Sequence, residues 1–290
     1  MNIVVRYAIT LFLFPGGVFA LLAGWVLLWL SEESGARVCG TLRRGFTQPL
    51  RDCVKLLGKT TSLPAGTEAG GARLLLLLAV VAPLLALVLL PLPGNSAANT
   101  IETSGDLLAI LLLLLLPVLM PLFLGELLAS PYGRIAARRE VWRCGLLIGG
   151  LLLSTLTIVV QRGALSLSIL TLQQLHPSPA SVMVNILAGL LFLLCLPALL
   201  PPATWGLFSG SPELIAGAYT DLTGAGLALM LLSAALQRVA AGSLLAALFV
   251  LPFVTNGLIA QVAAYLATLL FSSLFAGFAS GVSKRYSFAR

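Results

Sequence analysis

Long runs of apolar residues, broken by short polar segments, dominate the chain. A helix needs about 20 mainly apolar residues to cross the hydrocarbon core of a bilayer. The pattern predicts eight membrane-spanning helices, near residues 8–30, 73–93, 106–129, 144–161, 181–202, 216–237, 239–256 and 261–282. The first run is much longer than the apolar core of a signal peptide and lacks a convincing cleavage site, so we expect it to be a true span.

The composition agrees with a protein that is embedded in lipid. Of the 290 residues, 59% are apolar and only 9% are charged, whereas a soluble domain carries about 25% charged residues. The net charge of +7 is scattered among membrane-length apolar runs, and this excludes a nucleic-acid-binding domain. We therefore expect an all-α, polytopic membrane protein that forms one transmembrane domain over residues 1–290, with the lipid bilayer around it.

The distribution of Lys and Arg predicts how the chain is oriented, because cytoplasmic loops carry an excess of both. With eight spans, one side of the membrane receives eleven basic residues, in and beside 31–72 and 130–143, and the other side receives six. Both segments are therefore predicted to be cytoplasmic loops, with both termini outside. The basic tail after residue 282 favours an alternative with seven spans, in which the C-terminus is cytoplasmic.

The cytoplasmic loop 41–66 is predicted to contain an amphipathic surface helix that begins at Pro49. Its apolar positions recur at helical spacing, and they are Leu50, Cys53, Val54 and Leu57. The charged residues before and around this helix are Arg43, Arg44, Arg51, Asp52, Lys55 and Lys59. A basic amphipathic helix is typical of a membrane surface, and this one is compatible with lipid anchoring or with docking of a partner protein.

The second cytoplasmic segment, 130–143, is short and basic. It contains one acid, Glu140, among four arginines, namely Arg134, Arg138, Arg139 and Arg143. Such a segment can be a solvated turn or a docking patch for an acidic soluble partner. Composition does not distinguish the two.

Three acids lie close to predicted spans. Glu213 and Asp221 are eight residues apart, which on one helix is about 12 Å along the axis and roughly 80° around it. Ionisable groups at membrane depth are costly, and they usually face an aqueous cavity or a partner charge. Glu126 lies near the cytoplasmic end of the third span. All three are candidates for carrying protons, although Glu213 is also well placed to cap a helix that follows Ser211-Pro212.

The cysteines give no support for a metal site in this chain. The four of them are widely separated, without a CxxC pair, and His176 is the single histidine. Zinc sites and iron-sulfur clusters need several such ligands close together. We expect free structural cysteines and no cofactor bound to this chain.

Three segments together resemble one protein family. They are RRG…QPLRDCVKLLGK (43–59), SPYGRIAARRE (130–140) and PELIAGAYTDLTG (212–224). They are similar, in order, to an arginine-glycine element with an amphipathic helix, to a small-residue loop that ends in an Arg-Glu pair, and to a segment with two acids. The family is the eight-span heel subunit that respiratory complex I shares with membrane-bound energy-converting nickel-iron hydrogenases, including formate hydrogenlyase.

This resemblance implies a non-catalytic subunit in the inner (plasma) membrane of a prokaryote. In the family, such a subunit anchors peripheral hydrogenase-like large and small subunits to antiporter-like membrane subunits, and the iron-sulfur clusters and nickel-iron site belong to the peripheral arm. For such a subunit, we expect coupling or proton relay by Glu140, Glu213 and Asp221, and by Glu126 because of its place near the end of the third span. The resemblance assigns partner docking to Arg43, Arg44, Arg51, Asp52, Lys55, Lys59, Arg134, Arg138 and Arg139. The aspartate in PLRDCVKLLG resembles the hydrogenase branch more than the quinone-reducing branch.

The chain also departs from the family pattern. Before Glu213, it has PPATWGLFSGSP where family members usually carry an arginine and several acids, and Ile148 stands where many have a glutamate. A proton line needs ionisable groups or water at each step, so anchoring is better supported than conduction. Two alternatives stay open. One is a quinone-chamber subunit of a complex I-type dehydrogenase, and the other is a stand-alone transporter, although the internal repeat expected of a transporter is not evident.

Overall fold

The computed structural model describes residues 12, 14–40, 45–61, 66–93, 106–128, 131–167, 170, 179–200, 221–254 and 257–288. This described part is helical, without strands. The long helices are α2 (Gly17–Cys39), α4 (Ala69–Leu89), α5 (Asp106–Leu127), α6 (Pro131–Arg162), α8 (Pro179–Cys195), α11 (Ala225–Leu245) and α12 (Gly257–Phe288). The short elements are α3 (Gln48–Leu57), η3 (Leu196–Leu199), η4 (Ala246–Val250) and η5 (Leu251–Phe253).

The predicted fold class is confirmed. Within the described part, six helices are long and apolar enough to cross a membrane, and the shorter apolar helix Ala180–Cys195 accompanies them. The six are Gly17–Cys39, Ala69–Leu89, Leu107–Leu127, Cys144–Arg162, Ala225–Phe253 and Gly257–Val282. The protein is therefore an all-α, multi-pass membrane protein.

The separate spans predicted near 216–237 and 239–256 are wrong. One continuous helical segment, Ala225–Phe253, replaces them. The adjacent polar residues Gln237 and Arg238 suggested a break at the surface, but both are buried inside the bundle. Nε2 of Gln237 donates to the Leu114 carbonyl at 2.7 Å, and Nη1 of Arg238 donates to the Ala234 carbonyl at 2.9 Å. Because each side chain donates one hydrogen bond to a backbone carbonyl, the polar pair is accommodated within the helix.

Two helix ends also lie beyond their predicted positions. The predicted loop 130–143 is helical from Pro131 onwards, where α6 begins. Proline is well suited to a first helical position, where its missing N–H costs nothing. Helix α2 also extends beyond its predicted end and continues to Cys39. Gly40 caps it in a left-handed conformation, with a φ of 68° and a backbone N–H that donates to the Ala36 carbonyl. Polar residues near the end of α2 lower the local hydropathy, and the hydropathy pattern therefore predicted an end that is too early.

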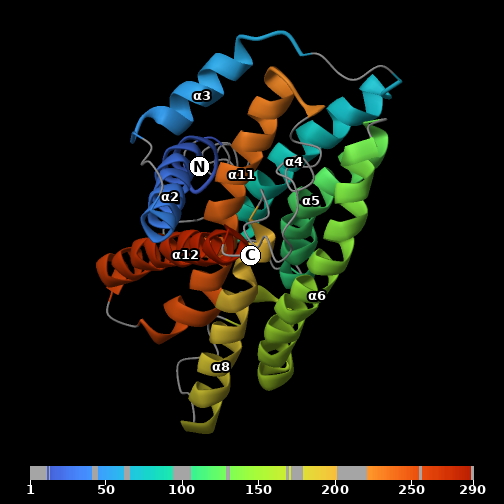
Figure 1. The fold of residues 1–290 in the computed structure, drawn as a ribbon. Helices are drawn as coiled ribbons and strands as arrows, with labels where there is room; N and C mark the ends of the chain where they lie inside the picture. The colour runs from blue at the N-terminus through green and yellow to red at the C-terminus, as the bar shows by residue number, and fades with distance from the viewer. Residues whose placement is uncertain are drawn as a thin grey trace, which may run out of the picture.

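Helix α11 is the central element of the bundle. It packs against α2, α4, α5 and α12, and nearly all of its residues from Ser233 to Leu245 are buried. The outer helices α6 and α8 pack against each other, and α6 also packs against α5. Figure 1 shows α11 running through the middle of the structure, and α6 lies along the outer edge of the bundle. This arrangement leaves α11 shielded by protein and α6 exposed along one side.

A serine on α11 satisfies a backbone group that a proline leaves open. Pro83 lies inside α4, and its missing N–H leaves the Ala79 carbonyl without its helical donor. Oγ of Ser233 donates to this carbonyl at 2.7 Å, and the hydroxyl is buried. In the apolar interior, an unsatisfied carbonyl is costly, so neighbouring helices commonly supply such donors.

A Ser233→Ala variant is therefore expected to lower the stability of the bundle by about 1 kcal/mol. The loss would appear as a lower thermal midpoint of the purified protein in detergent. The matched control is Ser154→Ala. Ser154 is equally buried, but its hydroxyl donates to Leu151 within its own helix. If both variants melt at the same temperature, the bond from Ser233 to the kinked helix contributes nothing specific.

Helices α2 and α12 run side by side in the same direction. Near their middle, Oγ of Ser273 donates to the Leu27 carbonyl at 2.5 Å, and near their ends Sγ of Cys39 donates to the Gly281 carbonyl at 3.2 Å. Residue numbers rise together along both helices, so both C-terminal ends lie on one side of the membrane.

The C-terminal end is consequently on the side that holds α3, and its expected position outside is wrong. The prediction failed because one helix replaces two predicted spans. The number of crossings falls by one, as in the seven-span alternative, and the C-terminal end therefore changes sides. With Lys284 and Arg285 added, the basic residues on this side rise from eleven to thirteen. The corrected topology thus agrees better with the rule that cytoplasmic segments are positive.

Candidate functional site

The three segments that carry the family resemblance come together at one end of the bundle. Figure 1 shows α3 at this end, together with the starts of α4, α6 and α11. We call this contact region the junction, and we define it by Lys59, Thr60, Gly125, Gly133, Asp221 and Gly224. The first and third segments meet at Gly224, and the second and third meet at Asp221.

Gly224 joins the start of α11 to the residues that follow α3. Its φ is +60°, in the left-handed region that favours glycine. A Cβ on this residue would lie 2.5 Å from the Thr60 carbonyl oxygen and 2.9 Å from that of Lys59. Only a glycine lets the two backbones approach this closely, so the conformation and the contact both require it.

Asp221 lies against the beginning of α6. A Cβ on Gly133 would be 3.3 Å from Oδ2 of Asp221 and 3.3 Å from the Gly125 carbonyl oxygen. A Cβ on Gly125 would in turn be 2.8 Å from the Gly133 carbonyl oxygen. Two glycines therefore allow α5 and α6 to cross closely, and the carboxylate of Asp221 packs on the backbone at this crossing.

The carboxylate of Asp221 is the most unusual polar group of the junction. Its residue is partly buried, and Oδ2 is removed from solvent without a hydrogen-bond partner in the described part of the chain. Leaving a buried acceptor unsatisfied costs free energy, so such a group usually reflects function or a bound water. Among the predicted relay acids whose side chains the structure describes, Asp221 is the one with a buried oxygen that lacks a hydrogen-bond partner.

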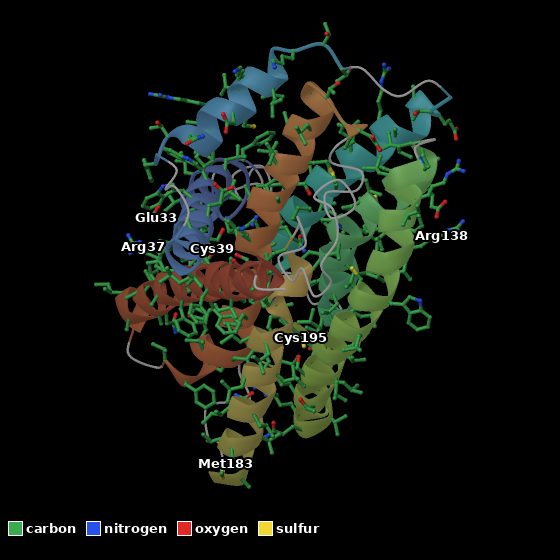
Figure 2. All side chains as sticks on the ribbon, viewed as in Figure 1. Glu33, Arg37, Cys39, Arg138, Met183 and Cys195 are labelled. Atoms are coloured by element: carbon green, nitrogen blue, oxygen red, sulfur yellow. The ribbon has the colours of Figure 1, made fainter. Side chains whose placement is uncertain are left out.

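Glu126 lies at the end of α5 with a half-exposed side chain. It is the second-last residue of this helix, and its Oε1 lies 3.4 Å from Nε of Arg138. Because α6 already begins at Pro131, Glu126 lies beside this next helix and is not buried inside the bundle. Figure 2 shows Arg138 at the outer edge of α6.

The basic residues predicted to dock partners are exposed wherever the structure describes them. On α3 and just after it, these are Arg51, Lys55 and Lys59, and on α6 they are Arg134 and Arg138. Asp52 on α3 is half-buried. Three residues of the predicted site lie outside the described residues, namely Arg43, Arg44 and Glu213, and the side chains of Arg139 and Glu140 are also not described.

The predicted amphipathic helix is present as α3, and it has two distinct sides. Leu50, Val54 and Leu57 are exposed, whereas Cys53 is half-buried, and the helix packs on α11 and α2. Burial raises the pKa of the Cys53 thiol above its ordinary value, so this cysteine stays protonated and unreactive at neutral pH. The remaining cysteines, Cys39, Cys144 and Cys195, are also free.

Aromatic packing fixes the chain that leads into α3. The rings of Trp25 and Phe46 lie 4.6 Å apart, and those of Trp29 and Phe46 lie 5.1 Å apart. The indole Nε1 of Trp25 also donates to the Phe46 carbonyl at 3.1 Å. The surface helix is thus held at its beginning by α2 and after its end by Gly224.

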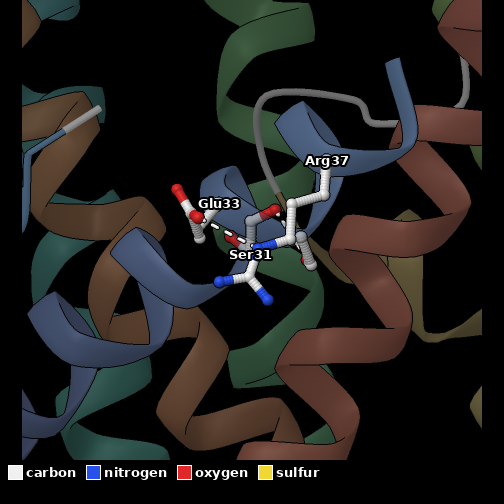
Figure 3. A network of polar contacts seen from close by, with 4 residues as sticks. Ser31, Glu33 and Arg37 are labelled. Atoms are coloured by element: carbon white, nitrogen blue, oxygen red, sulfur yellow. Dashed lines mark hydrogen bonds and ion pairs between the residues drawn. The ribbon is translucent and has the colours of Figure 1, made fainter. Parts of the chain in front are cut away.

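One buried acid was missed by the sequence interpretation. Glu33 on α2 is 6% exposed, and its Oε1 lies 3.0 Å from Nε of Arg37, as Figure 3 shows. The spacing i, i+4 of opposite charges was the available signal. It was overlooked because the first span was predicted to end at residue 30. In the described residues, no group of three or more His, Cys, Asp or Glu is placed to hold a metal ion.

Comparison with known proteins agrees with this geometry. The family model described as NADH dehydrogenase matches residues 7–288. No curated protein matches the chain. Among solved structures, a chain from the membrane-bound sulfane sulfur reductase (MBS), an archaeal respiratory membrane complex, has the same fold, with a TM-score of 0.77 and 20% identity over 97% of this chain and 90% of that chain. The resemblance seen in the sequence is confirmed at the level of the family: the chain belongs to the NADH dehydrogenase family.

Proposed function

We propose that this chain is the non-catalytic membrane-anchor and coupling subunit of a complex I-related oxidoreductase with a hydrogenase-like peripheral arm. One observation carries the proposal. Three segments that are distant in sequence meet at the junction, directly behind the exposed basic helix α3. A stand-alone transporter has no evident need for such a convergence on one membrane surface.

The docking surface is the outward side of α3. Arg51, Lys55 and Lys59 are exposed there beside the exposed apolar residues Leu50, Val54 and Leu57. A basic rim steers an acidic partner and selects its orientation, while apolar contacts supply buried area. The partners are peripheral large and small subunits of hydrogenase type, and antiporter-like subunits join the chain within a prokaryotic plasma membrane.

Coupling would pass from the docked arm through the junction. A displacement of α3 moves Lys59 and Thr60, whose carbonyl groups rest against Gly224. Because Gly224 immediately precedes α11 and lies three residues after Asp221, the same displacement changes the surroundings of the buried carboxylate oxygen. Asp221 is therefore the first acid to respond, and Glu126, Glu140 and Glu213 are the other acids proposed for the relay.

A second candidate keeps the subunit role but changes the chemistry of the arm. The structural neighbour belongs to a sulfane sulfur reductase, and this favours an arm that reduces sulfane sulfur. In both cases, the iron-sulfur clusters belong to the partners, while a nickel-iron site belongs only to a hydrogenase arm. Metal analysis of the purified complex separates them, because nickel with iron supports the hydrogenase arm and iron without nickel supports the alternative.

Charge reversal on α3 tests the docking role. An Arg51→Glu/Lys55→Glu double variant is expected to reduce the amount of peripheral subunits that copurify with the tagged chain by about tenfold or more. The fold should be retained, because both side chains are exposed. The measurement is quantitative mass spectrometry of complexes purified in mild detergent.

Arg73→Glu is the matched control, since Arg73 is exposed on α4 but lies outside α3. This control should leave copurification unchanged. Normal copurification with the double variant would contradict docking at α3, and an equal loss with Arg73→Glu would indicate a general charge effect.

A further inference from the structure

Helix α6 exposes one continuous face over its whole length. Arg134, Arg138, Trp142 and Leu146 follow each other at four-residue spacing, and the exposed face continues through Leu153, Leu156 and Val160. At 100° per residue, all of these positions fall on one side of the helix. The opposite side is buried and includes Gly133, Ala137, Cys144, Leu151 and Ile158.

The order of residues along this face follows the polarity of a lipid leaflet. Two exposed arginines come first, then Trp142 with 85% of its surface exposed, then Leu146 with 78%, and Val160 is still 74% exposed. Arginine suits the phosphate level, tryptophan suits the interface, and aliphatic side chains suit the hydrocarbon. A surface that binds a soluble partner has no reason to follow this order.

The length of the face also matches a bilayer. From Arg138 to Val160, the exposed face extends over about 33 Å of α-helix. The hydrocarbon core is about 30 Å thick, and the headgroup regions extend it to about 40–45 Å. Arg138 can therefore lie at headgroup level while the aliphatic residues that follow it on this face lie in hydrocarbon.

We infer that this face of α6 lies against lipid in the assembled complex, and that Arg134 and Arg138 bind the phosphate of an anionic lipid headgroup. Glu126 takes part in orienting the site, since it lies 3.4 Å from Nε of Arg138. This pairing leaves the terminal nitrogens of the guanidinium to face a phosphate, which accepts hydrogen bonds from Arg in a bidentate manner. Arg134 and Arg138 are thereby assigned to lipid, whereas α3 keeps the partner protein.

Fluorescence quenching by brominated lipids tests both parts of the inference. The Trp142 signal is the difference in tryptophan fluorescence between the wild-type protein and a Trp142→Phe variant. It is measured in vesicles of brominated phosphatidylglycerol or brominated phosphatidylcholine. We expect the Trp142 signal to be quenched by both lipids, and about twofold more strongly by phosphatidylglycerol in mixed vesicles. An Arg134→Gln/Arg138→Gln variant should lose this preference, whereas Arg73→Gln should keep it.

The same measurement on the purified complex decides between lipid and protein. Quenching of Trp142 that persists after assembly supports the lipid-facing position. Quenching that disappears on assembly overturns it, because a partner subunit then covers α6. A preference for phosphatidylglycerol that survives loss of both arginines overturns the headgroup site. None of these outcomes depends on whether α3 docks the peripheral arm.

Discussion

A Gly224→Ala variant is expected to detach α3 from α11 and to prevent stable assembly with peripheral subunits. The φ of +60° at this position costs an alanine about 1–2 kcal/mol, and its Cβ would also overlap the Thr60 carbonyl oxygen 2.5 Å away. Both effects act on the same contact, and backbone atoms cannot give way as a flexible side chain can. We therefore expect the residues after α3 to move away while the bundle stays folded.

Labelling of Cys53 measures this detachment directly. The thiol is half-buried on α3, so a thiol reagent should modify it faster once the helix is released, and peptide mapping distinguishes it from Cys39. The matched control is Gly70→Ala. Gly70 lies in the first turn of α4, and a Cβ there meets nothing within 4 Å. Unchanged labelling of Cys53 in the Gly224→Ala variant would show that the close approach at Thr60 does not hold α3 in place.

The hydropathy pattern predicted the class of fold because the bilayer imposes one length on every crossing helix. It failed at Gln237 and Arg238 for a related reason. Hydropathy treats a polar pair inside an apolar run as a surface break, but it cannot register that α11 is surrounded by other helices. In that setting, the polar side chains bond to carbonyl groups such as that of Leu114, and the helix continues.

The amphipathic helix was predictable, whereas the junction behind it was not. The period of Leu50, Cys53, Val54 and Leu57 depends on local spacing alone, and α3 has that spacing. The contact of Gly224 with Thr60 depends on how α11 packs in the bundle, which no local pattern records. The family resemblance pointed to the three segments as candidates for a shared role. The structure adds that they contact one another at the junction.

The acids show the same division between local and tertiary information. Glu126 looked buried because it ends an apolar run, but the early start of α6 leaves it exposed beside Arg138. Asp221 looked similar in the sequence, and yet its Oδ2 is buried against Gly133. The difference comes from the helix crossing at Gly125 and Gly133, and it makes Asp221 the acid whose substitution should have the larger effect on coupling.

An Asp221→Asn variant is accordingly expected to separate electron transfer from ion movement. Asparagine has nearly the same shape, so packing on Gly133 and assembly should persist, but its side chain cannot gain or lose a proton. In inverted membrane vesicles that contain the complex, electron transfer should continue, while proton uptake should fall by about tenfold or more. The two rates are measured on the same vesicles, so that a loss of protein affects both equally.

Glu68→Gln provides the matched control for this variant. Glu68 is an exposed acid that immediately precedes α4, on the same side of the membrane but outside the junction, and its loss should leave both rates unchanged. If Asp221→Asn lowered electron transfer and proton uptake in parallel, Asp221 would be needed for assembly and not for coupling. Full proton uptake in this variant would remove the junction from the coupling route and leave α3 as an anchor only, since the buried oxygen that links α11 to α6 would then have no part in moving protons.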